Sequence, residues 1–241
     1  MITSVDNPRV KEVVRLRTGR ERRRSGLFVA EGPREVERAH GAGLRIVATY
    51  FAPELLEWPD GEPVSARVLA KMAYRASPEG VLAVVEAPKR ELPRGGSLYL
   101  VAVGIEKPGN LGAMARSADA AGADAHVVAE AEADPWNPNA IRSSTGAVFT
   151  LPIVEASLED VRGLGVQFVA AVVDAATPYT AADLRQPTAL VLGSEDTGLE
   201  ERWREAADVS ISIPMAGRTA DSLNTATAAS VLLFEAVRQR G

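Results

Sequence analysis

The stretch Leu190-Val-Leu-Gly-Ser-Glu-Asp-Thr-Gly-Leu199 joins a short apolar run to an abrupt polar turn, and it indicates the fold of the C-terminal part of the chain. An apolar strand that ends at Gly193 directs the polar groups after it toward one edge of a sheet. In open α/β proteins, ligands bind at the carboxyl ends of the strands. A similar turn follows Ile211, and a third lies upstream at 108–116. Each alone would be an ordinary strand-to-helix connection, but the three together favour a shared ligand site.

Apolar and amphipathic segments alternate from residue 98 to the end of the chain. Apolar runs predict strands at 98–103, 125–129, 168–173, 189–192 and 209–213. Helices are expected at 111–121, 139–144, 157–164, 199–206 and 222–238. Strands that are apolar on both faces and alternate with helices predict a parallel sheet covered by helices, that is, an α/β/α domain.

A segment rich in Pro, Gly and charge, 86–97, precedes this pattern and is typical of a linker. Before it, helices are expected at 8–16, at 33–42 and after Ser65, with strands at 27–30, 46–51 and 81–85. We therefore expect an α/β protein of two domains. A smaller α/β domain spans residues 1–90, and a larger parallel-sheet domain spans residues 97–241.

The composition of this 241-residue chain excludes several classes of site. It has no cysteine, which removes disulfides and thiolate chemistry, and its two histidines, His40 and His126, are too scattered for a typical zinc site. We expect each of them to be a surface or packing residue. The chain has no apolar run of 18 residues or more, and its N-terminus lacks a signal peptide. These features predict a cytoplasmic, metal-free protein.

The net charge of −5 hides an uneven distribution. Residues 1–94 carry 17 basic and 13 acidic side chains, whereas residues 95–241 carry 10 and 19. A basic cluster near the N-terminus could hold a nucleic-acid backbone, because the guanidinium group matches phosphate with a planar fork of donors. A solvated, basic helix end is an equally weighted alternative. The candidate phosphate contacts are Arg9, Lys11, Arg20, Arg22, Arg23 and Arg24.

The loops carry none of the common nucleotide-binding or hydrolase signatures. G-x-G-x-x-G, G-x-x-x-x-G-K-[ST] and G-x-S-x-G are all absent. Asn110 is placed to cap the helix that follows it, and Arg116 projects from that helix. Each candidate has a plain structural alternative, such as an arginine that reaches solvent or an ordinary helix cap. The candidate catalytic residues are Asn110, Arg116, Glu195, Ser222 and Asn224.

Three motifs in this order resemble those of the SpoU (TrmH-like) family of RNA ribose 2′-O-methyltransferases, within the SPOUT superfamily. They are Asn110-Leu-Gly-Ala-Met-Ala-Arg116, then Leu190-Val-Leu-Gly-Ser-Glu195 with Gly198-Leu199, then Ile213-Pro-Met with Ser222-Leu-Asn224. The stretch 135–146 and the N-terminal stretches 7–11 and 27–32 are also similar, so the resemblance covers nearly the whole chain. Ser194, Asp196 and the longer stretch 217–221 depart from the commonest family pattern.

The resemblance implies a deep trefoil knot in the C-terminal domain, a homodimer, and S-adenosylmethionine as the methyl donor. The implied cofactor residues are Leu192, Gly193, Ser194, Glu195, Gly198, Ile213, Met215, Ala216, Gly217, Leu223 and Ala228. It also implies an N-terminal domain that binds RNA, with Arg142 as a further RNA contact. A separate substrate domain favours ribosomal RNA of the large subunit. The alternatives are a transfer RNA 2′-O-methyltransferase and a non-catalytic RNA-binding or ribosome-assembly protein.

Methyl transfer to a ribose requires alignment of two atoms and loss of the hydroxyl proton. We expect Arg116, contributed by the partner subunit, to bind the phosphate beside the target ribose and to polarise the hydroxyl group. Because a guanidinium group stays protonated at neutral pH, it is a poor base. Asn224 and Ser222 are expected to orient the hydroxyl or Arg116, and Glu195 to hold the loop.

Overall fold

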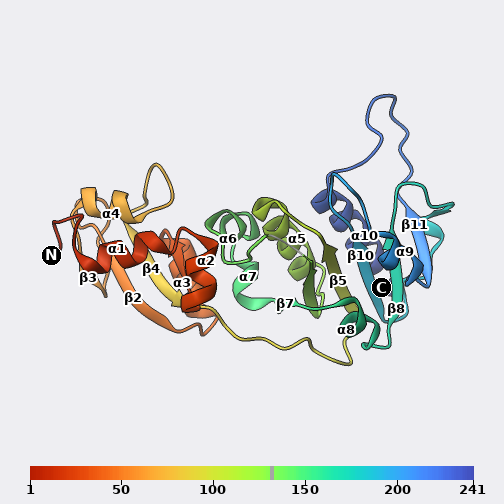
Figure 1. Ribbon diagram of the computed structural model, residues 1–241, viewed down its shortest axis with the longest axis horizontal. Coiled ribbons are helices and arrows are strands. Elements are labelled where there is room, and N and C mark those ends of the chain that lie inside the picture. The colour runs from red at the N-terminus through yellow and green to blue at the C-terminus, as the bar shows by residue number, and fades with distance from the viewer. Residues whose placement is uncertain (131–132) are drawn as a thin grey trace. The chain divides into compact units, whose positions relative to one another are not determined.

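The computed structural model describes residues 1–130 and 133–241, which form two compact units (Figure 1). The first unit comprises Met1–Lys89 and Trp136–Phe149, and the second comprises Arg90–Pro135 and Thr150–Gly241. Along the chain, β4 ends at Glu86 and β5 begins at Leu98, so the stretch 86–97 joins the last strand of one sheet to the first strand of the other. The segment 136–149, however, was expected in the second domain and instead packs with the first unit.

The first unit has a four-stranded sheet in the order β1-β4-β2-β3. Its strands are β1 (Leu27–Glu31), β2 (Ile46–Phe51), β3 (Glu62–Pro63) and β4 (Val81–Glu86). Strand β4 is antiparallel to β1 and β2, whereas β2 and β3 are parallel. The helices from the first stretch of chain are α1 (Pro8–Arg15), α2 (Gly19–Ser25), α3 (Pro33–Gly41) and α4 (Ala66–Met72). The buried faces of α1 and α4 join the sheet in one apolar core.

Aromatic stacking attaches the later segment to this unit. It contains α6 (Pro138–Ser144) and most of α7 (Ala147–Thr150). The ring of Phe28 in β1 stacks on Trp136, with centroids 4.6 Å apart, and on Phe149 at 5.9 Å. Arg38 of α3 donates a hydrogen bond to the carbonyl of Thr145, which ends α6 in a left-handed conformation. These contacts complete the first unit with residues that lie far along the chain.

The second unit is built on a seven-stranded sheet in the order β7-β6-β5-β10-β8-β11-β9, and all its pairings are parallel. This confirms the predicted parallel sheet. The strands are β5 (Leu98–Val103), β6 (Ala125–Ala129), β7 (Ile153–Glu155), β8 (Gln167–Ala171), β9 (Thr177–Pro178), β10 (Thr188–Leu192) and β11 (Val209–Ser212). The helices are α5 (Pro108–Ala120), α8 (Leu158–Arg162), α9 (Glu201–Glu205) and α10 (Thr225–Arg240), with a 3₁₀ turn at Tyr179–Ala181.

Strand order decides where the polar turns meet. Strand β10 lies beside β5, and its last residue, Leu192, pairs with Ala102. The turns that leave these two strands therefore begin at neighbouring points of the same edge. Helices α5 and α10 pack on each other, and the hydroxyl groups of Ser117 and Ser230 are 2.7 Å apart between them. The turn after β5, the turn after β10 and the start of α10 are thus close in space.

The two histidines have contrasting environments. His40 is exposed, while His126 is fully buried in β6, where neither ring nitrogen has a hydrogen-bond partner among the described residues. Burial lowers the pKa of His126 to about 4, so the ring is neutral near pH 7. It is a packing residue. Over residues 1–130 and 133–241, no helix has the length and apolar character needed to cross a bilayer, and no three His, Asp or Glu side chains are grouped as metal ligands.

Candidate active site

A hydrogen-bonded network joins the three turns at the carboxyl edge of the large sheet. Lys107, which follows β5, forms an ion pair with Glu195, which follows β10, at 2.5 Å between Nζ and Oε2. The side-chain amide of Asn224 donates to the other oxygen of Glu195 and, at 3.3 Å, to Oδ1 of Asn110. The structure thus brings together Asn110, Glu195 and Asn224, which come from three separate motifs.

Electrostatics keep this network in its charged form. The Lys107 ammonium, followed by the Asn110 amide and the Thr225 N–H, holds the pKa of the Glu195 carboxyl below its ordinary value of 4.5. Glu195 in turn raises the pKa of Lys107. At neutral pH, Glu195 is therefore an ionised acceptor that orients its neighbours and a weak base. Sequence reasoning missed Lys107, because only the pairing of β5 with β10 brings its side chain to Glu195.

The turn from Gly193 to Gly198, called the closed turn below, is held by its own hydrogen bonds. The backbone of Ser194 and Gly198 exchanges two bonds of 3.1 and 3.2 Å, and the Ser194 and Thr197 hydroxyls are 2.7 Å apart. A Cβ at Gly193 would collide with the carbonyl group of Gly198 and the backbone nitrogen of Leu199. The Thr225 hydroxyl donates to the Gly193 carbonyl at 3.1 Å and so ties the turn to α10. These hydrogen bonds within the turn and to α10 define its geometry.

The third motif lies largely on an exposed loop, 213–223, called the open loop below. Figure 1 shows it, in blue, as a long excursion between β11 and α10. Ala216 and Gly217 are exposed, Leu223 is 37% exposed, and Ile213 and Met215 are half-buried. Among the described residues, no backbone hydrogen bond joins this loop to the rest of the unit. Within the described part of the chain, no backbone hydrogen bond joins this loop to the closed turn.

Helix boundaries differ from two expectations. Asn110 was expected to cap α5, but that helix begins at Pro108 with Lys107 as its N-cap, so the capping prediction was wrong. The proline, whose ring fixes φ, starts the helix earlier. Ser222 was expected to open the last helix. Instead Asn224 is the N-cap of α10 and accepts from the N–H groups of Ala226 and Thr227. Ser222 is exposed, and among the residues that the structure describes its hydroxyl bonds only to Asp221.

Arg116 stands apart from the network in the single chain. It lies in α5 and is exposed, and within the described residues it makes no hydrogen bond or ion pair. The structure does not place it against Glu195 or Asn224. A role beside them would require the partner subunit.

The basic cluster of the first unit divides into available and occupied side chains. Arg22 is only 4% exposed and donates to the carbonyls of Leu16 and Arg17 at 2.7 and 2.9 Å. The prediction that Arg22 contacts RNA was therefore wrong, because its guanidinium ties α2 to the end of α1. Ion pairs join Arg9 to Glu62, Lys11 to Asp6 and Arg24 to Glu21. Arg20, Arg23 and Arg142 are exposed, and no hydrogen bond or ion pair is found for them within the described residues.

Family models match both parts of the chain. The SpoU rRNA Methylase family matches residues 97–234, and the MRM3-like substrate binding domain matches residues 7–83. The two matched ranges follow one another along the chain without overlap.

Similar proteins carry related names. The chain is 36% identical to a 23S rRNA (uridine(2479)-2′-O)-methyltransferase of Streptomyces viridochromogenes, over 91% of this chain and 85% of that protein. It is 30% identical to the 23S rRNA (guanosine(2553)-2′-O)-methyltransferase RlmP of Bacillus subtilis, over 97% of both proteins. The crystal structure of an AdoMet-bound rRNA methyltransferase from Sinorhizobium meliloti superposes with a TM-score of 0.87 at 31% identity, covering 98% of this chain and 97% of that one. The matched family model spans more than half of the chain, and the chain therefore belongs to the SpoU rRNA Methylase family.

Proposed function

We propose that this protein transfers a methyl group from S-adenosylmethionine to a ribose 2′-hydroxyl of 23S ribosomal RNA. The network of Lys107, Asn110, Glu195 and Asn224 is the observation that carries the proposal. It gathers ionised and amide side chains from all three family motifs at the strand ends where α/β proteins bind ligands. The names of the relatives support 23S ribosomal RNA as the substrate class.

The two loops at this edge suit the cofactor. Free backbone N–H and C=O groups in the open loop can bond an adenosyl ligand, and Ile213, Met215 and Leu223 offer apolar contact. The closed turn offers a fixed backbone at Leu192–Gly198. When bound, S-adenosylmethionine supplies an electrophilic methyl group. The chain's own contribution is to hold the ribose hydroxyl in line and to assist loss of its proton.

Each polar residue has a separate role in this proposal. Glu195 stays ionised and fixes the amide of Asn224, which orients the ribose hydroxyl or Arg116. Arg116 binds the phosphate beside the target ribose, and Ser222 closes over the site when the open loop folds around the cofactor. Because Arg116 is exposed and unpaired within the described residues, it is available to a second subunit.

The proposed assembly is a homodimer in the cytoplasm, with a trefoil knot in each catalytic unit. Exposed apolar side chains on α10 support the dimer: Phe234 is 49% exposed and Val237 36%. This helix packs on α5, which carries Arg116. A dimer that covers Phe234 and Val237 would bring α5 of each subunit toward its partner.

The test is to map 2′-O-methyl groups on purified 23S ribosomal RNA and transfer RNA after incubation with the protein and S-adenosylmethionine. We expect one modified ribose in 23S ribosomal RNA. Arg116→Ala should lose methyl transfer while keeping cofactor affinity. Arg116→Lys keeps the positive charge but removes the planar guanidinium group, so its activity shows which of the two the reaction needs. Wild-type turnover by Arg116→Ala would remove this residue from the mechanism, and absence of cofactor binding would favour a non-catalytic RNA-binding protein.

A further inference from the structure

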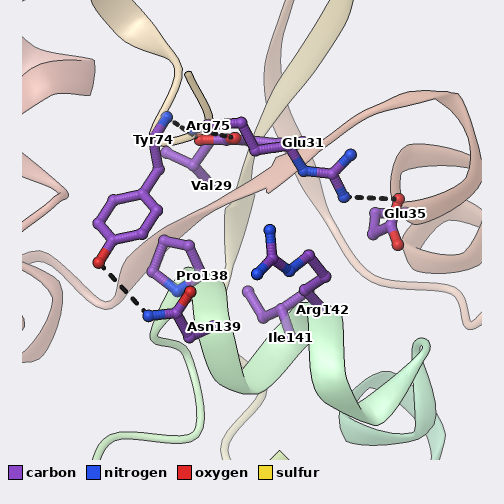
Figure 2. Close-up of a pocket in the computed structure, with 9 residues that line it drawn as sticks. All are labelled: Val29, Glu31, Glu35, Tyr74, Arg75, Pro138, Asn139, Ile141 and Arg142. Atoms are coloured by element: carbon purple, nitrogen blue, oxygen red, sulfur yellow. Dashed lines mark hydrogen bonds and ion pairs between the residues drawn. The ribbon is translucent and has the colours of Figure 1, made fainter. Parts of the chain in front are cut away.

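The first unit contains a shallow, open pocket between β1, the residues that follow α4, and α6 (Figure 2). Val29, Pro138 and Ile141 form an apolar part of its lining. Tyr74 stands at one side and is 45% exposed. The polar part of the lining comes from Arg142 and Asn139 of α6 together with Glu35 and Arg75. An apolar surface, an aromatic face and a cation thus share one small site.

Buried carboxylates build the wall that carries Tyr74. Glu31, which is 8% exposed, accepts hydrogen bonds from the backbone N–H groups of Tyr74 and Arg75. Arg75 is in turn held by ion pairs to Glu35, at 3.8 Å, and to Glu79. The Tyr74 hydroxyl accepts a hydrogen bond from the Asn139 amide at 3.4 Å. The backbone of Tyr74 is therefore fixed, and the single positive charge of Arg75 is already held by the two carboxylates of Glu35 and Glu79.

Arg142 differs from Arg75. In Figure 2 its side chain extends from α6 into the pocket, and no dashed line joins it to another residue. It is exposed and forms no ion pair or hydrogen bond within the part of the chain that the structure describes. The pocket therefore has one cation without a counterion beside one exposed aromatic ring. An exposed arginine without an ion-pair partner is suited to bind a phosphate group, because its guanidinium offers a planar fork of donors.

We propose that this pocket binds one unstacked nucleotide of single-stranded RNA, with its base against Tyr74 and its phosphate at Arg142. This inference rests on the proposed function, which makes RNA the substrate. Sequence-independent contact with a duplex uses rows of cations along the backbone, whereas an unpaired base offers a face for an aromatic ring. The Glu35 carboxylate in the wall disfavours a second phosphate.

The experiment measures binding of the full-length protein to a labelled oligouridylate and to a duplex RNA of equal length at several salt concentrations. Tyr74→Ala should weaken binding of the single strand by about fivefold to a hundredfold and leave the salt slope unchanged. Tyr74→Phe should bind like the wild type. Arg142→Gln should lower the slope of log K against log salt by about 0.7. Arg67→Gln removes an exposed arginine from α4 outside the pocket, and it should change neither quantity.

A second measurement locates the contact. A single 4-thiouridine in the oligonucleotide should cross-link to Tyr74 or to residues 136–149. Unchanged affinity in Tyr74→Ala, or cross-links confined to α1 and α2, would overturn the proposal that this pocket binds RNA. The pocket would then bind a protein segment or no ligand. The proposed function fails separately, if the wild type methylates no ribosomal RNA while Tyr74→Ala still loses oligouridylate binding.

Discussion

The closed turn and the open loop occupy the same edge of one sheet, yet they are stabilised in opposite ways. The closed turn, 193–198, is cross-linked by backbone and hydroxyl hydrogen bonds and is tied to α10 through Thr225. The open loop, 213–223, is exposed, and its backbone bonds to nothing else among the described residues. One half of the proposed cofactor site is therefore preorganised, and the other half has to be ordered.

This difference assigns separate tasks to the two segments. A preorganised turn loses little conformational entropy on binding, so its contacts contribute directly to affinity. Ordering a loop costs about 1–2 kcal/mol per residue in backbone entropy, which the cofactor contacts must offset. We expect the closed turn to set the geometry of the site and the open loop to close around the bound cofactor.

A methyl group added to each loop gives the largest expected contrast. Gly193→Ala places Cβ against the carbonyl of Gly198, a backbone atom that cannot move without opening the turn. Gly217→Ala meets no atom within 4 Å. We expect Gly193→Ala to lower the free energy of unfolding by about 2 kcal/mol or more and to abolish binding of S-adenosylmethionine. Gly217→Ala should stay within about 0.5 kcal/mol of the wild type. Urea unfolding measures the free energy of unfolding, and calorimetric titration measures cofactor binding. Equal effects of the two substitutions would show that the two loops are stabilised in the same way.

Hydrogen exchange tests the comparison without a substitution. Amides of 213–223 should exchange near the rate of an unstructured peptide in the free protein, because no hydrogen bond to the rest of the described chain protects them. Saturating S-adenosylmethionine should slow them by roughly tenfold or more, equivalent to about 1.4 kcal/mol. The amides of Ser194 and Gly198 should already be protected before the cofactor is added. Protection of 213–223 in the free protein would contradict the ordering model.

The same contrast marks how far the sequence predicts the site. The parallel sheet followed from apolar runs, and the end of β10 at Leu192 was predicted to the residue. The helix expected from residue 157 is present as α8, and a capping box of Ser157 and Asp160 begins it. Local patterns decide these features. Strands β7 and β9 have only three and two residues, too short for any pattern to show.

Features that depend on distant contacts could not be predicted in this way. Stacking of Phe28 on Trp136 draws 136–149 into the first unit, and nothing near either residue signals it. Arg22 lies within a run of three arginines, but only the folded α2 shows that it turns inward to the carbonyls of Leu16 and Arg17. The side chain of Lys107 becomes meaningful only once β5 and β10 are neighbours.

Removal of one buried hydrogen bond should have an intermediate effect. Thr225→Val keeps the shape of the side chain but leaves the Gly193 carbonyl without the hydroxyl that now donates to it. We expect a loss of about 1 kcal/mol in the free energy of unfolding and weaker cofactor binding, since the closed turn is no longer tied to α10. Thr227→Val changes an exposed threonine in the same helical turn and is the matched control. If both variants unfold alike, Thr225 does not anchor the turn.

The smallest effect on stability is expected at Glu195. Its partner Lys107 has a side chain that is 65% exposed, so Glu195→Gln should cost less than about 1 kcal/mol near pH 7. The pKa of Glu195 is lowered in the folded protein, and its stabilisation is therefore complete above its ordinary pKa of 4.5 and is lost as pH falls through the lowered value. Unfolding curves of the wild type and Glu195→Gln should thus differ at pH 7 and converge in acid.

Glu86→Gln, at an exposed ion pair with Arg45 in the first unit, is the control for a charge removed away from the site. Only Glu195→Gln should reduce methyl transfer, because the amide of Asn224 loses its ionised acceptor while the closed turn stays intact. Equal methyl transfer by the two variants would mean that the network braces the loops without orienting the reacting groups.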